Sequence, residues 1–302
     1  KLWGTTDPVS ITDTGTITIN DDDSAAITIA DVSVSENAGT ATVTLTLDKA
    51  TSGAFSLDLS TTDGSATTSD NDYSSLISQL VSFSGNPSEN QTVSITLNDD
   101  LKVEDNETFT VVMSNLSGLQ ANISLSDTAQ VTITDNDNAT VTIADVDVSE
   151  GDNKTLTLTS NNVVVGGFTL NVSTLADNAT SGTDFTAINS QSISFTGTSG
   201  EQKNVTLATT EDQVVEGDER FWIILSNSSN ASVDVSDNAS VTINDDDSAG
   251  FTLSKREALV AETGTTDTFT VQLTSEPIAN VTLTLNDNDS GNEVLYPSSV
   301  VF

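Results

Sequence analysis

Apolar residues alternate with Thr and Ser along many short stretches of the chain. Examples are TATVTLTLD at 40–48, QTVSITLND at 91–99 and NVTLTLND at 280–287. A period of two with many β-branched residues is typical of antiparallel strands that bury one face. Clusters of Gly, Asn, Asp and Ser between these stretches predict turns. No stretch shows the 3.6-residue apolar stripe of a helix, so the pattern predicts an all-β chain.

The strand pattern itself repeats. The stretch AITIADVSVSE at 26–36 returns as TVTIADVDVSE at 140–150, and VEDNETF at 103–109 returns as VEGDERF at 215–221. The spacing is roughly that of one immunoglobulin domain and far longer than the units of helical solenoids. We therefore expect tandem immunoglobulin-like antiparallel β-sandwiches.

The repeat predicts where the modules begin and end. Two complete modules are expected at 24–137 and 138–247. Residues 1–23 contain VSITDTGTITINDDD at 9–23, which resembles the end of each complete repeat and predicts closing strands of a preceding or partner module. Residues 248–302 are expected to form a partial, divergent third β module.

Charge and composition narrow the function. The chain has 45 acidic residues against 8 Lys and Arg, a formal net charge of −37, and neither Cys nor His. Such a surface disfavours nucleic-acid partners and anionic membranes. Solubility or a saline habitat is an alternative explanation of the negative charge. The missing residue types exclude disulfides, imidazole metal sites and Ser-His-Asp triads. Small domains without disulfides often need another source of stability, and a bound metal ion is the obvious candidate.

The acidic residues recur at corresponding places in the two complete repeats, mostly at strand ends and in loops. Crowded carboxylates repel each other unless a cation neutralises them, and Ca²⁺ accepts about six to eight oxygen ligands with flexible geometry. A single Asp at a strand end is most often a turn residue. Turn chemistry does not require Glu at the same place in each repeat, so the recurring set favours calcium. It includes Asp72 in the first repeat and Asp184 in the second.

The order of SVSE, DGSAT, NDY, NDD, a Glu pair before Phe, and a final VTI running into acids resembles the Calx-β repeat. That repeat occurs in the regulatory region of sodium–calcium exchangers and in large microbial surface proteins. The resemblance implies Ca²⁺ sites at one end of each sandwich. The ligands it implies are Glu36, Asp63, Asp99, Asp100, Glu104, Glu107, Asp135 and Asp137 in the first module, and Glu150, Asp177, Glu211, Asp212, Glu216, Glu219, Asp245, Asp246 and Asp247 in the second.

Three departures from the family pattern affect this ligand set. Asn136 replaces the middle acid of the first closing triplet, and Glu211 stands where the first repeat has Asp99. The loop around Asp177 is also shorter than the loop around Asp63. We expect the first two differences to change the number of ions or their coordination, whereas the third bears on the match of Asp177 to Asp63.

The resemblance and the charge together predict a calcium-rigidified, extracellular structural or adhesive segment, forming a stalk or filament of a cell-surface protein. The expected partners are neighbouring modules of the same or an identical chain, and cell-surface or matrix ligands, without nucleic acid or membrane insertion. Two alternatives stay open: a filament subunit joined by β-strand donation, and a calcium-sensing regulatory module. An enzyme is disfavoured, because aromatics are sparse and the acids recur in every repeat.

Overall fold

The structure, a computed structural model, describes residues 15–19, 22–118, 122–261, 263–286 and 296–302. The described residues form 22 strands and a single 3₁₀ turn, which confirms the predicted all-β class. They fall into two compact units. The described residues within Lys1–Asp100 and Asp105–Asn136 form the first, and those within Leu101–Glu104 and Asp137–Phe302 form the second.

The first unit is a sandwich of two sheets. The strand order is β6-β3-β1-β8 in one sheet and β2-β9-β7-β4-β5 in the other. Strands β2 and β9 run parallel, as do β1 and β8, whereas the other pairs are antiparallel. The elements are β1 (Ser24–Ile29), β2 (Val32–Ser35), the 3₁₀ turn η1 (Glu36–Ala38), β3 (Thr40–Leu47), β4 (Phe55–Thr62), β5 (Gln79–Phe83), β6 (Asn90–Thr96), β7 (Glu107–Ser117), β8 (Asn122–Ser124) and β9 (Thr128–Thr134).

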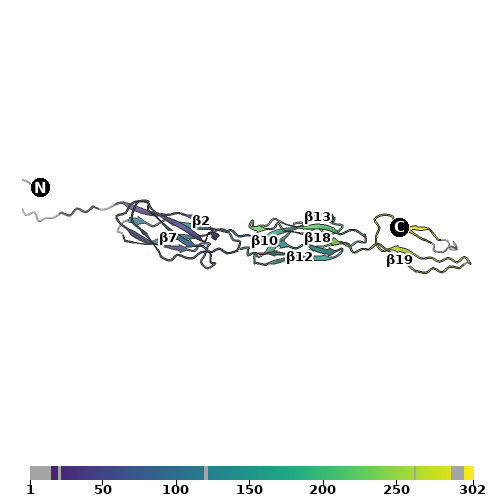
Figure 1. Cartoon of the computed structure of the whole chain (residues 1–302). Helices are drawn as coiled ribbons and strands as arrows, with labels where there is room; N and C mark the ends of the chain where they lie inside the picture. Colours follow the sequence, from purple (N-terminus) through teal and green to yellow (C-terminus); the bar gives the residue numbers. More distant parts are fainter. Residues whose placement is uncertain (1–14, 20–21, 119–121, 262, 287–295) are drawn as a thin grey trace, which may run out of the picture. The chain divides into compact units, whose positions relative to one another are not determined.

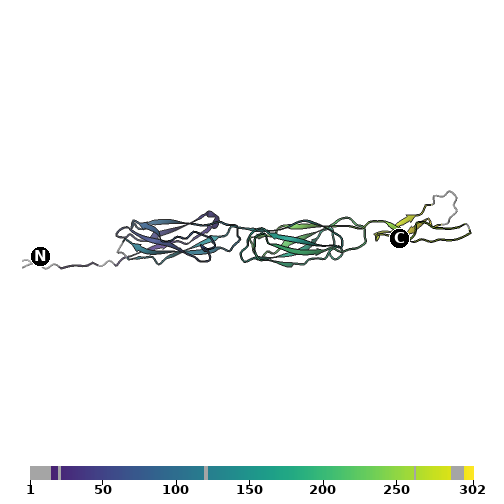
Figure 2. The same ribbon diagram turned by 90° about the horizontal axis from the view of Figure 1, so that it is seen from below.

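The second unit repeats this topology. Its sheets have the orders β15-β12-β10-β17 and β11-β18-β16-β13-β14, with β11 parallel to β18 and β10 parallel to β17. Figures 1 and 2 show its strands from two sides. The elements are β10 (Ala139–Ile143), β11 (Val146–Ser149), β12 (Asn153–Ser160), β13 (Phe168–Ala176), β14 (Gln191–Phe195), β15 (Gln202–Ala208), β16 (Glu219–Ser226), β17 (Val233–Asp234) and β18 (Asn238–Asn244).

The described strands after β18 are short and pair antiparallel with one another. Strand β19 (Phe251–Leu253) pairs with β20 (Val271–Leu273), and β21 (Thr282–Thr284) pairs with β22 (Ser299–Val301). None of its described residues is buried. At the other end of the chain, the stretch 9–23 lies partly outside the described residues, and its described residues form no strand.

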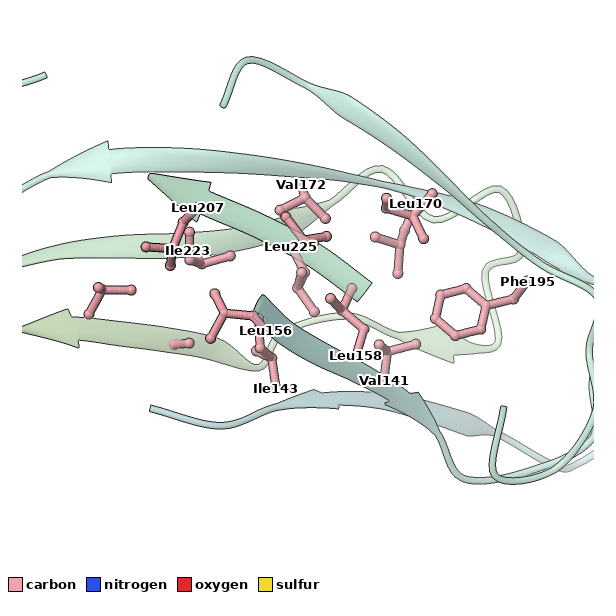
Figure 3. Packing of buried hydrophobic residues seen from close by; sticks show 14 of the residues in the cluster. Val141, Ile143, Leu156, Leu158, Leu170, Val172, Phe195, Leu207, Ile223 and Leu225 are labelled. Atoms are coloured by element: carbon pink, nitrogen blue, oxygen red, sulfur yellow. The ribbon is translucent and has the colours of Figure 1, made fainter. Parts of the chain in front are cut away.

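Alternation along the strands builds the core. In the second unit, Leu156 and Leu158 of β12 point inward with Thr157 between them, and Val172 and Ile223 reach the same core from the opposite sheet (Figure 3). All four are at most 4% exposed. Burying one such side chain contributes about 1.5–3 kcal/mol. The Thr and Ser residues of the sequence pattern therefore cover the outer faces.

A glutamate secures the turn between the two sheets in each unit. The carboxylate of Glu201 accepts hydrogen bonds from the backbone N–H groups of Thr196 (2.8 Å) and Gly197 (2.9 Å) and an ion pair from Lys203 (2.9 Å). Burial by itself would raise the pKa of Glu201, but these donors together lower it to about 2. Glu89 has the same role in the first unit, where the Ser84 N–H lowers its pKa to about 2.

This turn predicts an acid-sensitive contribution to stability. Because the folded pKa of Glu201 lies below its ordinary 4.5, the contribution is present above pH 4.5 and lost as the pH falls through about 2. We expect Glu201→Gln to lower the free energy of unfolding at pH 7 by about 1–2 kcal/mol, and by less at pH 2.5. Urea denaturation at both pH values measures this. Glu257→Gln, at an exposed position, is the control, and an equal loss at both pH values would contradict the account.

Candidate metal centres

Parallel strand pairing brings acids from distant parts of the chain together. In the second unit β11 and β18 pair in parallel up to Ser149 and Asn244, so both strands end at the same edge. Glu150 follows the first strand and donates its N–H to the Asn244 carbonyl (3.1 Å), while Asp245 follows the second. The first unit has the same arrangement, with Ser35 opposite Thr134. An acid at the end of an opening strand thus meets the closing acidic triplet.

The second repeat contains one tight carboxylate group. Glu150, Asp212 and Asp247 each offer an oxygen, and the three oxygens lie within 4.8 Å of one another. Asp212 is fixed by accepting the Val214 N–H (2.7 Å). Oδ2 of Asp247 is buried, and no group in the described part of the chain donates a hydrogen bond to it. A buried carboxylate oxygen without a donor is costly unless a cation contacts it.

Electrostatics at this group favour protons or a cation. Burial, followed by repulsion from Asp212 and Glu211, raises the pKa of Glu150 to about 7. Burial and then repulsion from Asp245 raises the pKa of Asp247. Close like charges disfavour ionisation, and a divalent ion removes that penalty. The group therefore has the chemistry of an oxygen-ligand cation site.

Neighbouring glutamates carry the same signature. Burial and a hydrogen bond with Asp184 raise the pKa of Glu219 to about 7. The pKa of Glu216 is raised first by burial and then by Asp212, and that of Glu211 first by repulsion from Asp246. Raised carboxyl pKa values are therefore found beyond the three residues of the tight group.

The first repeat contains two such groups. Glu36, Asp135 and Asp137 form one, and Asp72, Glu104 and Glu107 form the other, each with its oxygens within 4.8 Å. Asn136, at the middle of the closing triplet, accepts hydrogen bonds from the Ser35 hydroxyl (2.9 Å) and the Asn37 N–H (3.3 Å) through Oδ1. At this departure from the family pattern, an amide oxygen holds the η1 turn.

Asp72 belongs to one of these groups and Asp184 contacts Glu219, although the resemblance did not imply either as a ligand. Each directly precedes an aromatic residue, and that ring stacks on a buried Phe: Tyr73 on Phe109 at 3.9 Å, and Phe185 on Phe221 at 4.0 Å. Those Phe residues lie two positions after Glu107 and Glu219. Stacking therefore places each Asp beside its Glu. The Asp-aromatic dipeptide in both repeats is the sequence signal for this position.

Asp63 and Asp177 have other contacts. Asp63 accepts a hydrogen bond from the Tyr73 hydroxyl (2.6 Å), and burial together with this bond raises the pKa of Tyr73 to about 12. Asp177 forms an ion pair with Arg220 through Nη2 (2.7 Å) and Nε (2.9 Å), and that guanidinium lies 5.4 Å from the Trp222 ring centroid. The predicted ligands that lie outside the three groups are Asp63, Asp99, Asp100, Asp177, Glu211, Glu216, Glu219, Asp245 and Asp246.

Two β-sandwiches of identical strand order, each with carboxylates gathered where parallel strands end, define a class of tandem acid-rich β modules. The Calx-beta domain matches residues 18–147 and 134–247. The chain therefore belongs to the Calx-beta domain family. The resemblance stated from the sequence is confirmed. No curated protein matches the chain.

Several solved structures are similar to parts of this chain. CBD12 from CALX1.2 is 20% identical, covering 67% of this chain and 80% of its own, with a TM-score of 0.33. The calcium binding domain CBD12 of CALX1.1 is 17% identical, covering 72% and 99%, with a TM-score of 0.34. The apo-form Calx CBD1 domain is 25% identical, covering 37% and 98%, with a TM-score of 0.34. The family assignment rests on the sequence match. Within the described residues, no helix is long and apolar enough to cross a membrane.

Proposed function

We propose that the chain binds Ca²⁺ at its carboxylate groups and that the bound ions stiffen a repeat segment of an extracellular structural or adhesive protein. The observation that carries the proposal is the group of Glu150, Asp212 and Asp247, with the buried Oδ2 of Asp247. All three belong to the ligand set that the resemblance implied.

The donor chemistry favours Ca²⁺ over other common ions. The candidate ligands are carboxylates, and the chain has neither the His nor the Cys that zinc prefers. Ca²⁺ accepts about six to eight oxygens in flexible geometry, and carbonyls and waters can complete its shell. Mg²⁺ requires a tighter octahedron and gives up its water reluctantly.

Stiffening follows from where the ligands lie in the chain. Asp247 is the last acid of the closing triplet, and the next segment begins at Ser248. Glu150 directly follows β11, near the start of the repeat, and Asp247 is the last residue of the repeat. An ion bound by both would link the start of the repeat to its end. The bound ion would reduce the conformational freedom of the backbone around Asp247. A chain of such modules would therefore be less flexible. A net charge of −37 also makes ion binding favourable by reducing self-repulsion.

Scattering and calorimetry on the whole 302-residue chain test this proposal. Titration calorimetry should detect Ca²⁺ binding with affinity in the range of extracellular modules, roughly 10⁻⁴ to 10⁻³ M, or tighter. Small-angle X-ray scattering should show a narrower distribution of interatomic distances in Ca²⁺ than in EDTA. Mg²⁺ at the same ionic strength is the control. Binding without a change in scattering would reject stiffening, and absence of binding would reject the proposal entirely.

A further inference from the structure

A short segment of the first repeat belongs to the second compact unit. Leu101–Glu104 lies in the sequence between β6 and β7, yet it is part of the unit formed by Asp137–Phe302. Val103 is 1% exposed and is a member of that unit's hydrophobic core, together with Val164. Leu101, two residues earlier, is 70% exposed. A single side chain of the segment is therefore the buried one.

Backbone hydrogen bonds hold Val103 in place. Its N–H donates to the carbonyl of Val163 (2.9 Å), and its own carbonyl accepts the N–H of Val165 (2.9 Å). This is a parallel β-bridge to Val164. Both polar groups of the Val103 peptide backbone are satisfied, as a buried residue requires.

The receiving loop is rigidly built. The Val164 N–H donates to the Gly197 carbonyl (2.9 Å), and Gly197 has a φ of +91°. A Cβ at Gly197 would lie 1.9 Å from the Val164 carbonyl oxygen, so only glycine fits there. The loop therefore presents a fixed backbone edge to Val103.

The receiving loop is also unusually apolar. Thr51 occupies the equivalent position in the first unit, where its N–H donates to the Gly85 carbonyl (2.9 Å). The first repeat thus has Ala50, Thr51 and Ser52 where the second has three consecutive valines. Within this run Val164 is 1% exposed and Val165 is 55% exposed, so the valine that pairs with Val103 is the one withdrawn from solvent.

The corresponding segment of the second repeat makes a similar bridge. Val214 forms a parallel bridge with Glu276, whose N–H donates to the Gln213 carbonyl (2.6 Å). Glu276 lies in the segment that follows the second repeat. The loop before β7 and the loop before β16 thus each pair with a residue that comes later in the chain.

We propose that the loop at 101–104 is a structural part of the repeat that follows it, so that the second sandwich is complete only when Val103 occupies its core. The interaction is an apolar side chain docked by a parallel β-bridge, and it needs no metal ion. The second sandwich then depends for part of its stability on a segment that precedes it in the chain.

The test uses the whole chain with Trp3→Phe, so that Trp222 of β16 alone reports unfolding of the second sandwich. Val103→Ala is expected to lower the Trp222 melting midpoint by roughly 5 °C, in EDTA and in Ca²⁺ alike. Leu101→Ala, in the same segment but exposed, is the matched control and should leave the midpoint unchanged.

Hydrogen exchange by mass spectrometry assigns the effect to a unit. Val103→Ala should speed exchange in peptides from β12 and β13 and leave those from β3 and β4 as in the unsubstituted chain. An unchanged Trp222 midpoint, or faster exchange confined to β3 and β4, would overturn the proposal. The shift in the Trp222 midpoint is expected in EDTA, where no calcium is bound. The experiment therefore tests this proposal independently of calcium binding.

Discussion

Calcium added to the metal-free chain is expected to raise the melting temperature of the second unit by about 10 °C. At a hundredfold excess over Kd, one ion contributes about 2.7 kcal/mol, and one kcal/mol moves the midpoint of a domain of this size by about 4 °C. Trp222 fluorescence, with Trp3→Phe, measures the shift. The gain comes from neutralising Glu150, Asp212 and Asp247, which lie within 4.8 Å of one another.

The double variant Asp212→Asn with Asp247→Asn separates this explanation from a general effect of calcium. It should lose most of the calcium-dependent shift. In EDTA the same variant should melt at or above the temperature of the unsubstituted protein, because Asp212 raises the pKa of Glu150 and its removal relieves repulsion. Asp234→Asn, at an acid whose pKa is lowered by the Ser236 N–H, is the control. A full calcium shift in the double variant would place the stabilising ion elsewhere.

In EDTA the second unit should be more stable at pH 5 than at pH 8. Glu150 and Glu219 have pKa values of about 7 in the folded chain, above their ordinary value of 4.5. Burial is the main cause for both, with repulsion from Asp212 at Glu150 and the contact with Asp184 at Glu219 adding to it. The folded state thus binds protons more tightly than the unfolded state. The resulting stability is fully present below pH 4.5 and lost as the pH rises through 7.

Melting curves at pH 5, 6, 7 and 8 measure this dependence. We expect a fall of roughly 5 °C between pH 5 and pH 8 in EDTA, which saturating calcium should abolish because the ion takes the place of the protons. Glu150→Gln with Glu219→Gln should flatten the profile. The turn glutamate Glu201 cannot produce this fall, since its pKa of about 2 acts only in strong acid and in the opposite direction. A midpoint that rises with pH in EDTA would refute the explanation.

The strand pattern and the repeat predicted the fold because both report local burial. Alternation of apolar residues with Thr in 40–48 and 91–99 becomes β3 and β6, with Val43, Leu45 and Ile95 buried. The recurrence of 26–36 at 140–150 becomes two sandwiches of the same strand order. Such features need no knowledge of which loops meet.

The acidic groups were predicted less completely, because they depend on packing between distant residues. Glu36 follows β2, and Asp135 and Asp137 follow β9, which pairs with β2 in parallel. The sequence could therefore predict that Glu36 lies near the closing triplet. Asp72 joins Glu107 through the stacking of Tyr73 on Phe109, a contact between distant parts of the chain that the Asp-aromatic dipeptide alone does not specify.

Two other contacts were invisible to the pattern. Asp177 matches Asp63 in the repeat, but Arg220 stands where the first repeat has Thr108 and forms an ion pair with it. Val103 looked like an ordinary loop residue of the first repeat, and only the three-dimensional contacts assign it to the second unit. A comparison of aligned positions shows which residues differ between the repeats. It does not show the contacts that those residues make, or which unit a loop segment joins.

The parallel pairing of β2 with β9, and of β11 with β18, has a mechanical consequence. In each sandwich these strands come near the start and the end of the repeat, and four residue pairs join them. Tension along the chain pulls such parallel neighbours lengthwise past each other. Their hydrogen bonds are then loaded together in shear, whereas a hairpin pulled from its open end loses them one at a time. We expect this pairing to make each module resist a pulling force before it extends.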